Sequence, residues 1–206
     1  MTFEYADKAI KQMNRVNLRS FGKLKQLKFD ELNVVSAVDQ TYAESIRLAK
    51  KRYKEIAMQA FIDAMLLCGY TRKLAEKEAE DSITNDWLLD MMEEYDPVTL
   101  YQFLPEADRK KQRLVEALIA AHNKGKEIEK ALRLWTLQIA HYADKSVVDG
   151  TIDGYKEAGV EKVEWIAVDD EKTCPECRKL DGKIFPIDKV PDRPHYHCRC
   201  ELRPIK

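Results

Sequence analysis

Apolar residues recur every three or four positions through most of the first 160 residues, a pattern that predicts amphipathic helices. The longest run starts near Gln40 and ends at Gly69, a residue type that commonly follows the last turn of a helix. Thr71 is then placed to cap a second helix, which we expect to continue through Trp87 until Pro97 stops it. Because the connection is so short, the two helices should form an antiparallel hairpin.

Two further helical runs follow before the pattern changes. Pro105 suits the first turn of a third helix, and apolar spacing continues in a fourth segment from about residue 128. We expect this segment to end at Gly159, with a bend near Gly150 or Gly154. The first four fifths of the chain should therefore be mostly helical.

The hydrophobic period changes from 3.6 to 2 near residue 160. Residues 160–168 mix alternation with β-branched and aromatic side chains, which predicts a strand, and Asp169-Asp170 supplies the turn after it. Short strands are also expected at 183–185 and 199–202, with a tight turn at Asp181-Gly182 before the first of them. The end of the chain should therefore hold a small sheet.

Composition and charge narrow the class of protein. The 206 residues are 45% hydrophobic and 34% charged, which is typical of soluble globular chains. The net charge of −1 removes a global argument for nucleic-acid binding, although residues 1–29 hold seven Lys or Arg against two acids, and residues 76–96 hold nine acids against one Lys. No apolar run approaches membrane-spanning length and no secretory signal precedes the helices, so we expect a cytosolic chain without membrane contact.

Four of the five cysteines lie in the last 33 residues. Zinc is held by four sulfur or nitrogen ligands at tetrahedral corners, and a two-residue spacer lets both thiolates of Cys174 and Cys177 reach one ion. His195 and Cys198 have the same spacer, and Cys200 faces the same side of an extended backbone as Cys198. The spacing predicts a structural zinc site, with His195 and Cys200 competing as the fourth ligand.

Other interpretations of these cysteines are weaker. Disulfides are disfavoured because we expect a cytosolic chain. Free buried thiols are disfavoured because the cysteines come in closely spaced pairs. Catalytic zinc is disfavoured because so many soft ligands would close the coordination shell. Asp169, Asp170 and Thr173 are expected to accept backbone amides and so pre-form the loop before Cys174; metal binding is their alternative role. His197 is expected at the surface.

The predicted fold class is mainly α with a small C-terminal α+β unit similar to a zinc ribbon: long helices followed by a short β-hairpin or sheet. We place a boundary near residue 105. It separates an N-terminal helical region, 1–105, from a second region, 106–206, whose zinc-knuckle unit covers about 160–206.

The order and spacing of the terminal residues carry a family resemblance. These residues are Trp165, Asp169-Asp170, Thr173-Cys174-Pro175, Cys177, Leu180-Asp181-Gly182-Lys183, Phe185, Pro194-His195, Cys198-Arg199-Cys200 and Pro204. They resemble the C-terminal signature of the Mu F-like minor head proteins of tailed phages, the head-morphogenesis family. The resemblance implies a non-enzymatic structural component inside the capsid, made in the host cytoplasm and associated with the portal. Such a protein would aid procapsid assembly, DNA packaging or ejection, with portal and capsid subunits as partners and phage genomic DNA or self-association as further contacts.

Two other functions compete with this one. A zinc-dependent nuclease or toxin could use His195 or His197 as base with Asp169 or Asp170 nearby, but the chain shows no clear second set of hard metal ligands. A zinc-ribbon module could bind nucleic acid through a weakly positive C-terminus.

The apolar cluster that begins at Trp87-Leu88-Leu89 is too broad for one helix face, so we expect a protein partner to cover part of it.

Overall fold

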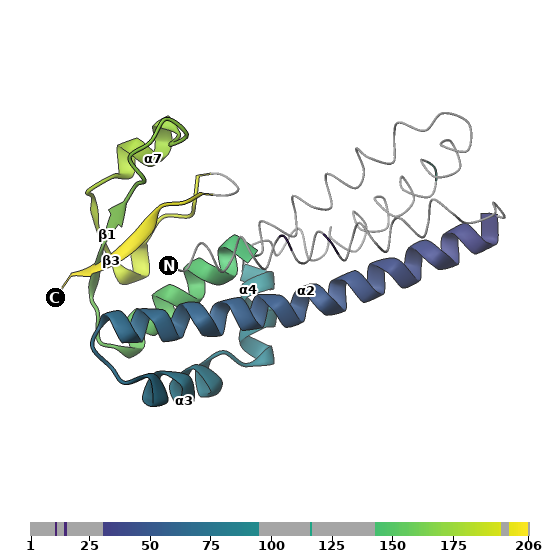
Figure 1. Cartoon of the computed structure of the whole chain (residues 1–206), viewed down its shortest axis with the longest axis horizontal. Helices are drawn as coiled ribbons and strands as arrows, with labels where there is room; N and C mark the ends of the chain where they lie inside the picture. The colour runs from purple at the N-terminus through teal and green to yellow at the C-terminus, as the bar shows by residue number, and fades with distance from the viewer. Residues whose placement is uncertain are drawn as a thin grey trace.

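The computed structural model describes residues 31–94, 143–194 and 198–205, together with Lys11, Arg15 and Glu116. The predicted third helix, the start of the fourth and the boundary near residue 105 lie outside these residues, as does Asp96-Pro97. The described part is mostly helical with a three-stranded antiparallel sheet near the C-terminus, which confirms the predicted fold class. Figure 1 shows the sheet beside one end of the longest helix.

The longest helix, α2, runs from Glu31 to Leu67 and begins earlier than the apolar pattern indicated. Its end is the predicted one. Gly69 has a φ of 94°, and the N–H of Tyr70 donates to the carbonyl of Met65 at 3.1 Å, which closes the last turn. Only a glycine adopts such a φ without strain, so this residue fixes where the chain reverses.

The second predicted helix is two helices, α3 (Arg72–Ser82) and α4 (Asn85–Glu94). Thr71 caps α3 as expected, since its hydroxyl accepts the N–H of Leu74 at 3.4 Å. The prediction of one continuous helix was wrong because Thr84 acts as a second cap: its hydroxyl accepts the N–H of Trp87 at 3.1 Å. A short hydroxyl side chain competes with the helical backbone in this way and starts a new helix.

A helix over residues 143–157 crosses α2, and two glycines make the crossing close (Figure 1). A Cβ added at Gly150 would meet the carbonyl oxygen of Ala57 at 2.4 Å, and one at Gly154 would meet that of Phe61 at 2.5 Å. The expected bend at these glycines is not found, because residues 143–157 are continuous helix. Their missing side chains instead let two backbones touch.

The sheet has the order β2-β1-β3, with β1 (Lys162–Ile166) between β2 (Ile184–Pro186) and β3 (Glu201–Ile205). Trp165 of β1 lies opposite Leu202 of β3. The turn at Gly182 has the expected positive φ of 70° and follows a short helix, α7 (Pro175–Leu180). β1 and β2 are therefore neighbours joined through the segment that carries the first two cysteines of the terminal group.

Three buried clusters hold the described residues together. The first lies among α2, α3 and α4 and contains Phe61, Met65 and Ile83. The second joins α2 to the sheet through Ala64, Tyr155, Val163 and Ile187. The third contains Trp165, Cys177, Cys198 and Cys200, and Val190 and Leu202 pack against both this cluster and the second.

The described part of the apolar cluster near Trp87 is packed inside the protein. Leu88 is 5% exposed, and Trp87 is half-buried against the first cluster, with its indole N–H donating to Asp153 at 2.7 Å. The side chains of Leu89, Met91 and Met92 lie outside the described set.

None of the helices in the described ranges has the length and apolar character needed to cross a bilayer.

Candidate metal centre

The first cysteine pair is built by the start of α7. Cys174 is the N-cap of this helix, with extended backbone angles, and Pro175 occupies the first turn, where no N–H is needed. The Cys174 sulfur accepts the backbone N–H of Cys177 at 3.3 Å. The two-residue spacer thus produces a tight turn that places the two cysteines side by side, as the sequence predicted.

The loop before this turn is organised by Asp170. Its carboxylate accepts the N–H of Lys172 at 3.0 Å and the hydroxyl of Thr173 at 3.1 Å, the Asx-turn role expected from the sequence. Arg199, which lies between the two C-terminal cysteines of the chain, donates to the same carboxylate at 2.7 Å. This hydrogen bond holds the pKa of Asp170 well below its usual range. One carboxylate thereby connects the two cysteine-bearing segments.

The sulfurs of Cys177, Cys198 and Cys200 converge on one point. All three residues are buried and their sulfur atoms lie within 4.8 Å of one another, with 3.6 Å between those of Cys177 and Cys198. A Zn–S bond of about 2.3 Å places two sulfurs at tetrahedral corners about 3.8 Å apart. The separation found is therefore close to that of two ligands of one zinc ion.

Cys174 and His195 differ in what the structure shows of them. Cys174 is half-buried, packs against the cluster that contains Cys198, and forms a hydrogen bond with the Cys177 thiol. It does not belong to the group of three whose sulfurs are all within 4.8 Å. His195 and His197 lie outside the described residues. The described residues thus gather all four terminal cysteines in one place.

Burial shifts the pKa of two of these thiols. Burial raises the pKa of Cys177, and hydrogen bonds with the neighbouring thiols raise it further. Burial also raises the pKa of Cys200. Burial therefore favours the protonated form of Cys177 and of Cys200, and a bound divalent cation would reverse this preference because a coordinating thiol loses its proton.

Trp165 supports the fit of a metal to this group. Its side chain is 2% exposed, and its indole nitrogen makes no hydrogen bond of ordinary geometry among the described residues. The indole N–H lies close enough to Cys200 that its interaction with the sulfur lowers the pKa of that thiol. A buried N–H needs an acceptor, and a metal-bound thiolate is a better one than a thiol.

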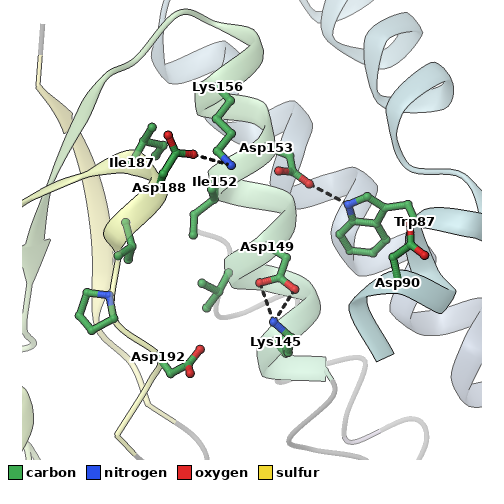
Figure 2. A pocket seen from close by; sticks show the side chains of 13 residues that line it. Trp87, Asp90, Lys145, Asp149, Ile152, Asp153, Lys156, Ile187, Asp188 and Asp192 are labelled. Carbon is green, nitrogen blue, oxygen red and sulfur yellow. Dashed lines mark hydrogen bonds and ion pairs between the residues drawn. The ribbon is translucent and has the colours of Figure 1, made fainter. Parts of the chain in front are cut away.

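A second feature is a hollow of about 700 Å³ between α4, helix 143–157 and residues 187–192. Figure 2 shows that three pairs of its polar groups interact: the Trp87 indole with Asp153, Lys145 with Asp149 and Lys156 with Asp188. Each of the two lysine–aspartate distances is 2.9 Å. These groups do not converge on a common point as the sulfurs do. We therefore place the candidate site at the cysteines.

The geometry defines a class of protein: a helical scaffold that carries a small unit in which three buried cysteines lie close enough together to bind a metal ion. Residues 113–203 match the model of the family described as Phage Mu protein F like protein. This match confirms the resemblance: over these residues the chain is similar to Mu F-like proteins. The match includes all four terminal cysteines, helix 143–157 and most of the sheet. No curated protein and no solved structure matches the chain significantly.

Proposed function

We propose that this chain is a minor head protein of a tailed phage, a structural component that acts in head morphogenesis. The observation that supports this proposal is the family match over residues 113–203, which includes the cysteine-built unit. In this role the protein resides in the virion, inside the capsid, and is made in the host cytoplasm. Its partners are the portal and capsid subunits, and it aids procapsid assembly, DNA packaging or ejection.

We further propose that the terminal unit holds one structural zinc ion. Cys177, Cys198 and Cys200 supply three thiolates, and Cys174, beside Cys177, supplies the fourth. His195 remains the competing fourth ligand that its spacing to Cys198 predicts. The ion compensates for a small core, because three short strands and a six-residue helix bury few large apolar side chains.

A non-enzymatic role agrees with the interactions that the side chains around the site already make. A tetrathiolate shell leaves no position for a reactive water. Asp170, the acid assigned to a nuclease by the alternative interpretation, already binds Arg199, Thr173 and the backbone of Lys172. It is thus used to hold the loop together.

The function is tested by head assembly in cells that co-express this chain with the portal and major capsid proteins of the same phage genome. We expect the chain to be recovered in purified procapsids, in few copies, only when the portal is present. Cys177→Ser should abolish incorporation, whereas Cys68→Ser, which changes the cysteine outside the terminal group, should not. Particles that form normally and never contain the chain would overturn the proposal.

The same purified chain separates the alternative functions. Cleavage of plasmid DNA in the presence of Mg²⁺ or Zn²⁺ would support the nuclease interpretation. Tight binding to duplex DNA with a steep salt dependence, without binding to the portal, would support a nucleic-acid module.

A further inference from the structure

Arg193 binds the backbone of the segment that carries the second pair of terminal cysteines. Its guanidinium donates to the backbone carbonyl of Cys198 and, at 3.0 Å, to that of Cys200. Both carbonyls belong to residues whose sulfurs join the metal group. The planar fork of an arginine can hold two acceptors at once in a fixed geometry, so this one side chain fixes the backbone that aims two sulfurs.

Arg193 is half-buried and lies near other ionisable groups. Burial lowers the pKa of its guanidinium, while the attraction of the cysteines and of Asp144 raises it. Asp144 is 7% exposed and lies in the helix of residues 143–157. The positive charge is thus attracted both by a buried carboxylate of this helix and by the cysteines.

The other arginines of the unit differ from Arg193. Arg199 and Arg178 are exposed and bind the Asp170 loop, and Arg203 is exposed and pairs with Glu164 at 3.1 Å. Of the arginines in the described part of the chain, Arg193 is the one whose guanidinium binds the carbonyls of two cysteines of the metal group.

We propose that Arg193 is the positioning residue of the metal centre: it aims the Cys198 and Cys200 thiolates at the ion and offsets their negative charge. This inference rests on the proposed zinc site. Four thiolates around Zn²⁺ carry an excess of two negative charges, which a buried site must balance with nearby donors or cations. The guanidinium supplies one positive charge and two N–H donors at the second pair of ligands, and the Asp144 carboxylate attracts it.

The test measures zinc affinity of the full chain by competition with a chelator, together with the thiolate-to-metal absorption of the Co²⁺-loaded protein. Arg193→Ala should weaken zinc binding about 10- to 100-fold, the usual effect of removing a partner that orients a ligand. Arg193→Lys, which keeps the charge without the fork, should recover part of this loss, whereas Arg193→Gln should recover less. Arg203→Ala, a matched arginine on the exposed face, should bind zinc as the unchanged chain does.

The outcomes are separable. If Arg193→Ala and Arg203→Ala bind zinc within about twofold of each other and give the same Co²⁺ spectrum, Arg193 has no positioning role. If Arg193→Ala does not fold, the comparison of the Lys and Gln variants decides: equal zinc affinities overturn the proposal, and a clear advantage for Lys supports it. An unchanged chain that binds neither ion shows that the metal centre itself is wrong, and the inference then fails with it.

Discussion

The helical part of the molecule and its C-terminal unit are stabilised in different ways. Where α2 meets the helix of residues 143–157, Gly150 and Gly154 bring the backbone against Ala57 and Phe61, and an apolar core surrounds the contact. In the C-terminal unit the buried cluster consists of Trp165 and three cysteines. The first region is stabilised by close packing of apolar side chains, whereas the proposed zinc site would make the second depend on the metal that its sulfurs bind.

The two regions meet through a small number of specific contacts. Tyr155 is 1% exposed and its hydroxyl donates to the carbonyl of Leu202 in β3 at 2.9 Å. Burial raises the pKa of this phenol, so it stays neutral and serves as a donor. Ala64 of α2 packs in the same cluster as Val163 of β1. The sheet is therefore anchored to the helices by contacts that do not involve the cysteines.

The difference between the helical part and the C-terminal unit predicts that loss of a proposed metal ligand has the largest effect on stability. Cys177→Ser should unfold the C-terminal unit and leave α2 and α3 folded, because structural zinc contributes about 10–16 kcal/mol of apparent binding free energy in small units of this kind. Hydrogen exchange followed by mass spectrometry should show fast exchange over residues 162–205 and continued protection of the central part of α2.

Cys68→Ser is the matched control, since Cys68 is half-buried beside the Tyr155 cluster and not in the metal group. It should leave exchange in the C-terminal unit unchanged. Equal protection of this unit in the Cys177→Ser and Cys68→Ser variants would show that its fold does not depend on the cysteines.

The next effect concerns the helix crossing. Gly154→Ala should destabilise the protein by about 1–3 kcal/mol, because the new methyl group would meet the Phe61 carbonyl oxygen at 2.5 Å. Chemical denaturation monitored by circular dichroism measures this loss. Glu157→Ala, at an exposed position of the same helix, should change stability by less than about 0.5 kcal/mol. A stabilising Gly154→Ala would mean that the close crossing is wrong.

A smaller effect is expected at the edge of the hollow in Figure 2. Trp87→Phe removes the indole N–H that binds Asp153 and should cost about 1 kcal/mol, since the hydrogen bond is only partly buried. A double-mutant cycle with Asp153→Ala isolates this interaction. Strictly additive effects of the two changes would show that the hydrogen bond does not contribute.

The smallest effect is expected for Asp170, the half-buried residue whose carboxylate connects the cysteine segments. The pKa of Asp170 is lower in the folded protein than its ordinary value of 3.8. The ionised carboxylate therefore contributes its full stabilisation of the folded state at any pH above 3.8. This stabilisation is lost only as the pH falls through the lower pKa of the folded state. Asp170→Asn should therefore reduce the melting temperature slightly and by the same amount from about pH 8 to about pH 5. Asp169→Asn is the control. A difference that disappears between pH 7 and pH 5 would contradict the proposed ion pair with Arg199.

Local signals predicted much of the fold. Gly69, Gly159 and Gly182 were expected to end helices or form a turn, and all three have positive φ values. The strand near residue 160 and the capping role of Thr71 also followed from residues next to one another. Such features depend on nearby chain, which a single sequence displays directly.

Features that depend on distant segments were missed. Gly150 and Gly154 suggested a bend because the sequence does not show that Ala57 and Phe61 lie across from them. The cysteine spacing indicated the metal group, but the role of Arg193 depends on where the carbonyls of Cys198 and Cys200 point. The break at Thr84 could have been found, since a threonine three residues before Trp87 is a recognisable cap.

The most direct test of the central claim is the zinc content of the full chain, purified without chelator under reducing conditions and measured by native mass spectrometry. The account predicts one zinc ion per chain, retained in Cys68→Ser and lost in Cys177→Ser. A metal-free chain whose C-terminal unit is equally protected from hydrogen exchange, with its four terminal cysteines either free or paired in two disulfides, would contradict it.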